Sequence, residues 1–234
     1  MSRGKKYKEG QALIDREKNY LPEEAFELLQ KAAYANFNET VEVHFNLGID
    51  PRHADQMIRG TIMLPNGIGK ESTVIVITDG ENESIAKKAG ADEVGSDELI
   101  QKIQGGWLDF DVLIATPNMM PKLGKLGKLL GARGLMPSPK KGTVTTNIES
   151  AVKEFKAGKL EYKNDKDGIV HIIIGKKEFK KEQLLTNFEA IYTQLQKDKP
   201  NKAKGTYFKS ISISTTMGPG IKIESMQTRW SEGN

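Results

Sequence analysis

The 234-residue chain contains no cysteine, only three histidines and no long apolar run. The absence of cysteine excludes disulfide bonds, thiolate metal sites and cysteine nucleophiles. Three scattered histidines argue against a zinc centre or a histidine-based catalytic centre, so we expect no metal and no cofactor. No stretch reaches the ~18 apolar residues of a membrane-spanning helix, and no apolar segment follows the basic start, Met1–Tyr7. We therefore expect a cytoplasmic protein with no membrane partner.

The net charge of +4 hides an uneven distribution. Between Gly69 and Ile114, four lysines stand beside ten carboxylates, which leaves this segment at −6 and the rest of the chain at +10. A basic excess of that size favours a surface that binds an anionic partner. A chance imbalance of solvated charges is the competing interpretation.

The N-terminal part of the chain combines a helix with strands. A helix is expected over Pro22–Tyr34, because proline and two glutamates suit its first turn. Apolar and polar residues alternate from Val41 to Ile49, which predicts a strand with one buried face. A second strand is expected over Ile58–Leu64. The proline and glycines of Pro65–Gly69 break regular structure and predict a linker.

From Val74 the pattern changes to short, wholly apolar segments separated by helices. Val74–Ile77 and Val112–Ala115 are expected to be strands that are covered on both faces. Helices are expected at about 84–89 and 96–104, with a helix over Ile148–Lys156 at the end of the segment. This alternation is typical of an α/β unit with a mostly parallel sheet.

After Gly158 the alternating pattern returns. It predicts strands over 160–163, 169–174 and 207–215 and a helix over 181–197. One face of the last strand is lined by hydroxyl groups, those of Ser210, Ser212, Ser214 and Thr216.

These elements predict two domains, of α+β and α/β class. Because the first 67 residues lack a full sheet, we infer a discontinuous α+β domain of residues 1–67 and 159–234. A Rossmann-like three-layer α/β domain, residues 68–158, is inserted in it through two crossings. Glycines in both crossings can absorb a rotation, which predicts a hinge at Pro65, Gly67, Gly69 and Gly158.

The segment Pro117–Lys141 has four glycines, four prolines and no acidic residue. Glycines let a backbone approach phosphates closely, so we interpret the segment as a basic loop that contacts a nucleic-acid backbone. A flexible, solvated loop is the alternative, and the phosphate-binding GxxxxGK[ST] motif is absent. The basic residues are Lys122, Lys125, Lys128, Arg133, Lys140 and Lys141.

Two further segments suit RNA. Thr215–Gly220 offers backbone amides, hydroxyls and a methionine, which match the 2′-hydroxyls and sugar edges of RNA. As a bare pattern it also fits a turn between two strands, but five lysines and no acid between Lys199 and Ile223 favour binding. In Asn36–Thr40, Phe37 can stack on a base or fill the core.

A nucleotide-dependent enzyme is a less favoured alternative. Asp79 and Asp111 stand beside strand ends, but no GxGxxG follows the first strand of the α/β segment. His171 lies in an apolar strand, where we expect a packed core residue rather than a base. A generic basic RNA-binding adaptor is the other alternative.

The chain resembles the family of ribosomal protein L-one, the stalk protein of the large subunit, in its bacterial type. Two strings carry most of this resemblance, Leu130–Pro137 (LGARGLMP) and Ser214–Pro219 (STTMGP). Others agree in order along the chain: Phe37–His44, Leu47–Pro51, Ile58–Thr61, Leu64–Pro65, Gly69–Lys70, Gly124–Gly127 and Asn164–Lys166.

The resemblance implies a non-enzymatic constituent of the large ribosomal subunit whose terminal domain binds ribosomal RNA near the exit site. It further implies contact with departing deacylated tRNA in the exit site, and repression of translation through the operon mRNA that encodes the protein. The RNA-binding residues that it implies are Phe37, Thr40, Glu42, Asp165, Lys166, Ser210, Thr216, Met217 and Gly218.

Two features depart from this family. Asn36 stands where the family often has lysine, so one phosphate contact is missing. The end of the chain, Met226–Asn234 with Trp230, matches no part of the family, and we expect a disordered tail there.

Overall fold

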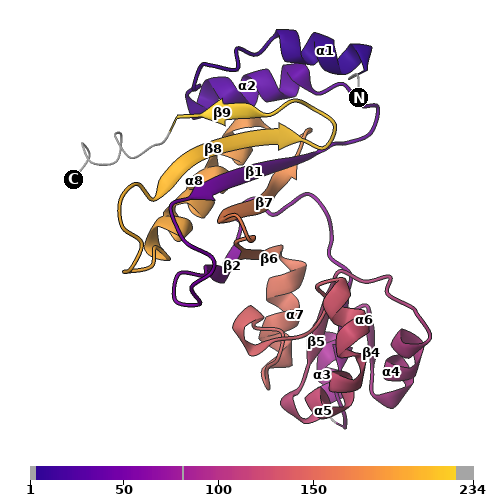
Figure 1. The fold of residues 1–234 in the computed structure, drawn as a ribbon. Coiled ribbons are helices and arrows are strands. Elements are labelled where there is room, and N and C mark those ends of the chain that lie inside the picture. The colour runs from indigo at the N-terminus through magenta and orange to yellow at the C-terminus, as the bar shows by residue number, and fades with distance from the viewer. Residues whose placement is uncertain (1–3, 81, 225–234) are drawn as a thin grey trace. The chain divides into compact units, whose positions relative to one another are not determined.

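A computed structural model describes residues 4–80 and 82–224 of the chain (Figure 1). The chain divides into a first unit, Met1–Gly69 with Tyr162–Asn234, and a second unit, Lys70–Glu161. The predicted tail from Met226 lies outside the described residues. Helices and strands are mixed throughout, which confirms the predicted class. In the part of the chain that the structure describes, every helix is too short or too polar to cross a membrane.

The first unit is built on a four-stranded sheet with the strand order β7-β1-β8-β9. All three pairings are antiparallel. Strands β2 and β6 form a separate two-stranded sheet. The chain returns from the second unit to the first within β6, between Glu161 and Tyr162. The elements are α1 (Lys5–Ala12), α2 (Pro22–Ala32), β1 (Thr40–Leu47), β2 (Arg59–Met63), β6 (Lys159–Lys163), β7 (Ile169–Lys176), α8 (Lys181–Lys197), β8 (Phe208–Thr215) and β9 (Ile221–Ile223).

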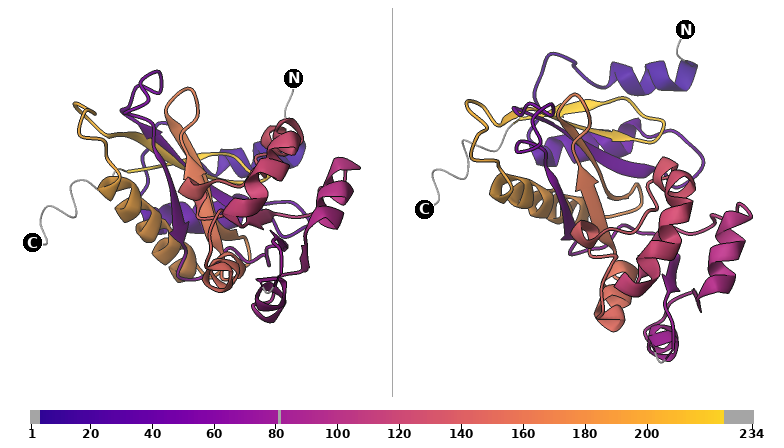
Figure 2. Two further views of the ribbon diagram at one scale, coloured as in Figure 1. Left: turned by 90° about the horizontal axis from the view of Figure 1, so that it is seen from below. Right: turned by 60° about the horizontal axis from the view of Figure 1, so that its bottom comes forward.

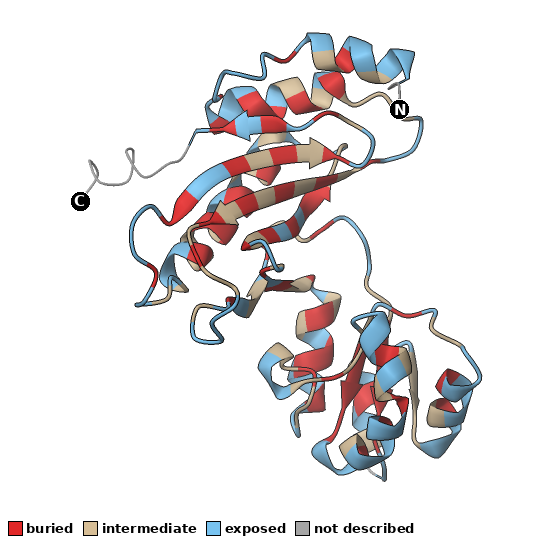
Figure 3. Cartoon of the chain, in the orientation of Figure 1, coloured by how far each residue is buried: buried red, intermediate tan, exposed pale blue. Residues whose placement is uncertain are grey.

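The core of the first unit lies between one face of this sheet and the pair α2 and α8, which pack side by side (Figures 1 and 2). The predicted alternation in β1 is confirmed, because every second residue is fully buried while the residues between remain accessible (Figure 3). Phe45 stacks on Phe188 with ring centroids 5.9 Å apart, and Tyr192 stacks on Phe208 at 4.5 Å. Aromatic packing thus anchors both β1 and β8 to α8.

Two elements of this unit were not predicted from the sequence, α1 and β9. The α1 segment lacks a clear apolar stripe, and it packs on α2 through Gly10, where an added Cβ would lie 2.8 Å from the carbonyl oxygen of Ala32. The β9 strand has only three residues and forms by pairing with β8. Neither element could be recognised by its own periodicity.

The second unit has a parallel three-stranded sheet with the strand order β4-β3-β5, and helices cover both faces. Helices α3 and α7 pack on one face, and α4 with the helical segment after β5 packs on the other. The elements are β3 (Val74–Ile77), α3 (Asn82–Lys88), β4 (Glu93–Gly95), α4 (Asp97–Gln104), β5 (Val112–Ala115), η1 (Pro117–Met119), α5 (Met120–Leu123), η2 (Gly124–Leu126), α6 (Gly127–Ala132), η3 (Pro139–Lys141) and α7 (Ile148–Lys156).

Candidate nucleic-acid interface

The second face of the four-stranded sheet is polar and accessible to solvent, and we call it the open face. Its rows follow from the strand register: Glu42 lies between Ile173 and Ser214, and His44 lies between His171 and Ser212. The open face consists of Thr40, Glu42, His44, Asn46, Ile169, His171, Ile173, Ser210, Ser212, Ser214 and Lys222. The predicted hydroxyl-lined face of β8 is part of it.

The turn after β8 is tied to the first residue of β1. The backbone amide of Thr40 donates to Thr216 Oγ1 at 3.0 Å, and the amide of Thr216 donates to the carbonyl oxygen of Thr40 at 3.1 Å. The amide of Gly218 donates to Thr215 Oγ1 at 3.1 Å, and an added Cβ at Gly218 would overlap that hydroxyl. Thr216 therefore holds the turn in place, while Met217 at its tip is 49% exposed.

Glu39 holds the Met217 turn in place, a role that the sequence did not single out. It is fully buried, its Oε1 accepts from the amide of Ala35 at 2.9 Å, and its Oε2 accepts from the amide of Met217 at 3.0 Å. Burial alone would raise the pKa of this carboxyl, but hydrogen bonds from Thr215 and from the two amides hold the pKa below its usual value. The ionised carboxylate joins the segment before β1 to the Met217 turn.

Exposed apolar side chains gather at this end of the sheet. Phe37 is 54% exposed, so it does not fill the core. Ile173 on β7 and Met217 are exposed as well. Large apolar groups held accessible beside hydroxyls and backbone amides suit stacking on bases and sugars.

Two of the three histidines meet in the middle of the open face. His44 Nδ1 lies 2.8 Å from His171 Nδ1, and His44 Nε2 lies 3.1 Å from Ser214 Oγ. The prediction that His171 packs in the core is wrong, because it occupies a solvent-facing position of β7. Burial lowers the pKa of His44, and the neighbouring His171 lowers it further, against a smaller opposing effect of Glu42.

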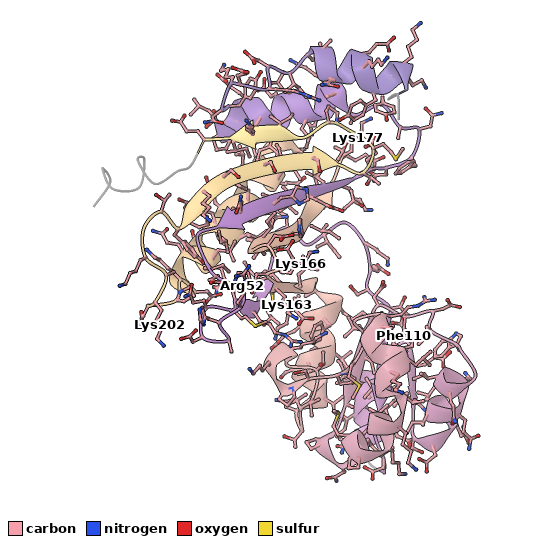
Figure 4. All side chains as sticks on the ribbon, in the orientation of Figure 1. Arg52, Phe110, Lys163, Lys166, Lys177 and Lys202 are labelled. Carbon is pink, nitrogen blue, oxygen red and sulfur yellow. The ribbon has the colours of Figure 1, made fainter. Side chains whose placement is uncertain are left out.

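The predicted residues Asp165 and Lys166 lie at the opposite end of the sheet, where β7 begins. Asp165 Oδ1 accepts from the amides of Asp167 and Ile169, at 2.9 and 2.8 Å, and closes the turn. Burial would raise the pKa of Asp165, but these amides and His171 lower it. Lys166 is exposed at the tip of the turn (Figure 4). The predicted RNA-binding residues thus occupy both ends of the open face and the surface between them.

Most of the basic segment of the second unit is helical, over residues 117–132 and 139–141, so its prediction as a loop is right only for residues 133–138. Leu123, Leu126 and Leu130 recur at helical spacing and are buried against the sheet. Lys122 pairs with Asp97 at 2.7 Å, and Lys141 pairs with Glu161 at 2.7 Å. Among the described residues no ion pair is seen for the remaining members, Lys125, Lys128, Arg133 and Lys140.

Of the two aspartates considered for a nucleotide-dependent enzyme, Asp79 and Asp111, the second has a structural contact. Asp111 accepts from Lys70 Nζ at 2.6 Å and from the amide of Thr73 at 3.1 Å. Burial would raise the pKa of Asp111, but these two donors lower it. This carboxylate fixes the entry into β3.

The predicted hinge residues differ in their surroundings. Asn187 Nδ2 donates to the carbonyl oxygen of Gly67 at 3.0 Å, and Asn187 Oδ1 accepts from the amide of Asn66 at 3.1 Å. The start of the first crossing is therefore held to α8. Gly69 and Gly158 have φ values of +71° and +95°, which other residues rarely adopt.

A sequence model of the ribosomal protein L1p/L10e family matches residues 29–219 of this chain. The match extends from α2 through the second unit to the turn after β8.

Proposed function

Because this chain belongs to the ribosomal protein L1p/L10e family, we propose that the open face of its first unit binds a structured site in ribosomal RNA at the stalk of the large subunit. Membership makes it a ribosome-associated protein of the large subunit that binds ribosomal RNA, in a family of structural proteins rather than enzymes. The proposal concerns which surface binds and which residues select the RNA.

One observation carries this proposal: the turn with Met217 is built around a buried carboxylate. Glu39 accepts from the Met217 amide, and Thr216 is bonded in both directions to Thr40. These bonds fix one exposed turn to the segment that contains Phe37. A preorganised surface of this kind binds a shaped ligand without the entropy cost of ordering itself. RNA offers the sugar edges and 2′-hydroxyls that such a surface fits.

Two finer roles belong to the same proposal. The second unit contacts deacylated tRNA in the exit site and assists its release, supported by the exposed lysines of its helical segment, such as Lys125 and Lys128. The first unit binds a similar site in its own operon mRNA and represses translation when ribosomal RNA is saturated. These roles place the protein in the cytoplasm.

Filter-binding titrations test the proposed specificity. A stalk ribosomal RNA fragment and an unrelated RNA of equal length are titrated at two salt concentrations. We expect clear preference for the stalk fragment at both, because shape recognition does not depend on charge alone. Equal affinity for the two RNAs would favour the generic basic adaptor. Nucleotide binding without RNA binding would favour the enzyme.

The substitution Met217→Asp tests the proposed surface. Met217 is exposed, so the change leaves the core intact and places a carboxylate where RNA approaches. We expect binding to weaken by at least about 1–3 kcal/mol, the range for a buried polar group without its hydrogen-bond partner. Leu13→Asp is the matched control, since Leu13 is 53% exposed at the end of α1. Equal binding by the two variants would contradict the proposed surface.

A further inference from the structure

A groove lies at the end of the first unit away from Met217, between the segment after β1 and the segment before β8. Figure 4 shows Lys202, which lines the groove, at the same end of the sheet as the exposed basic residues Arg52 and Lys166. Its lining residues are Gly48, Ile49, Asp50, Gln56, Lys202, Lys204, Thr206 and Lys209.

The floor of the groove is a fixed piece of backbone. The amide of Gly48 donates to the carbonyl oxygen of Tyr207 at 2.6 Å, and an added Cβ at Gly48 would overlap the carbonyl oxygen of Thr206. The amide of Asp50 donates to Gln56 Oε1 at 2.9 Å, which closes the loop on the other side. The walls of the groove therefore exist before any ligand binds.

The groove is positively charged. Its one lining carboxylate, Asp50, accepts from the backbone amide of Arg52 at 3.0 Å and is turned toward its own loop. Lys202 is paired with Asp55 at 2.5 Å. Lys204 and Lys209 are exposed, and no ion pair is seen for either among the described residues. These two ammonium groups remain available for an anion.

The groove is continuous with the open face. The register between β1 and β8 shifts between Asn46 and Leu47, so Lys209 is an extra residue in its strand. As a result Lys209 and its neighbour Ser210 are both exposed, one beside the groove and one on the open face. Lys209 therefore lies in the groove lining and next to the open-face residue Ser210.

We propose that this groove binds the sugar–phosphate backbone of the RNA whose bases and sugars contact the Met217 end. The proposal rests on the proposed function and extends it, because it makes one RNA span the whole open face. That face is eight residues long in β1, or about 25 Å at ~3.3 Å per residue. Lysine contacts phosphate as a point charge and does not recognise the base. The groove therefore positions the RNA, and the surface around Met217 determines which RNA is bound.

The double variant Lys204→Ala/Lys209→Ala tests the groove in the full chain. We expect weaker binding to the stalk fragment and a smaller slope of log affinity against log salt, by about one for each phosphate that a lysine no longer neutralises. Lys6→Ala/Lys8→Ala is the control, because it removes the same charge from exposed positions of α1. A salt slope of the double variant equal to that of the wild type would overturn the proposal that the groove binds phosphates. Loss of preference for the stalk RNA in the wild type would instead overturn the proposed function.

A tethered probe gives an independent test, because the chain has no cysteine of its own. Lys204→Cys is labelled with an iron–EDTA group that cuts RNA nearby, and Lys8→Cys is labelled as the control. We expect cuts at a discrete set of nucleotides in RNA bound to the Lys204→Cys protein and none with the control. Retained binding without cuts from position 204 would overturn the proposal.

Discussion

Glu39 shows how one buried residue controls an exposed site. A glutamate before a strand has the sequence signature of a solvated residue, and nothing in its neighbours marks it as buried. Its position follows from tertiary structure, because the amides of Ala35 and Met217 come from opposite ends of the unit's sequence. The sequence therefore led to the segment that contains Met217, through its residue types and through the resemblance, but it could not lead to the residue that positions this segment.

The substitution Glu39→Gln is expected to weaken both the fold and the binding. The amide group retains one acceptor oxygen, so one of the two backbone amides faces an NH₂ group and loses its partner. We expect the free energy of unfolding, measured in urea, to fall by about 1.5–3 kcal/mol, the range for a hydrogen bond to a charged group. RNA affinity should fall with it. Glu189→Gln, at an exposed position of α8, should leave both unchanged; a matching loss there would contradict the role of Glu39.

The histidine pair predicts a dependence of stability on pH. The pKa of His44 is lowered by burial and by His171 from its ordinary value of 6.5. Below pH 6.5 the unfolded chain therefore binds more protons at this position than the folded protein does. The free energy of unfolding then decreases as the pH falls from about 7 toward 5.5, and it recovers as the pH rises.

The variant His44→Asn should reduce this loss, because the group that resists protonation is gone. Urea denaturation at several pH values between about 5.5 and 7.5, on either side of the ordinary histidine pKa, measures it. His53→Asn serves as the control, since His53 is exposed and lies in the loop after β1. A pH dependence in His44→Asn as steep as that of the wild type would show that the pair is not its source.

At the scale of elements, strands with a clear pattern could be predicted and context-dependent helices could not. The alternation in β1 and the wholly apolar β3 and β5 each reflect how many faces are covered, so their patterns identified them. The segment Pro117–Lys141 is rich in glycine and proline, which oppose helix formation. Burial of its leucines against β3 and β5 outweighs that preference, and only the folded unit supplies those partners.

The segment after β1 packs closely on the segment before β8, and this close packing depends on Gly48. Because an added Cβ would overlap the carbonyl oxygen of Thr206, Gly48→Ala must move one of two backbone segments. We expect a loss of about 1–3 kcal/mol in the free energy of unfolding, the usual cost of overpacking. Gly220→Ala has open space around its Cβ and should change little. Equal stability of the two variants in thermal unfolding would show that the junction adapts freely.

At the scale of the whole molecule, the uneven charge gains a structural explanation. The acidic segment Gly69–Ile114 falls almost entirely in the second unit, and the lysine-rich stretch Lys199–Ile223 falls in the first. The sequence could therefore indicate the part that we propose to bind RNA. It could not separate the roles of the two ends of the open face, because Lys166 and Met217 become parts of one surface only through the pairing of β7 and β8 with β1.

If the two crossings act as a hinge, the distance between the two units should vary widely in the free protein. Asn187 holds the first crossing as far as Gly67, so we infer that rotation occurs at Gly69 and, on the return, at Gly158. Single-molecule energy transfer between dyes at Lys8→Cys and Lys128→Cys, one in each unit, measures this spacing. The control pair, Lys8→Cys with Lys197→Cys, lies within the first unit and should give a narrow distribution. If the pair that spans the units gave an equally narrow distribution, unchanged by bound RNA, the crossings would be rigid and the hinge would be wrong.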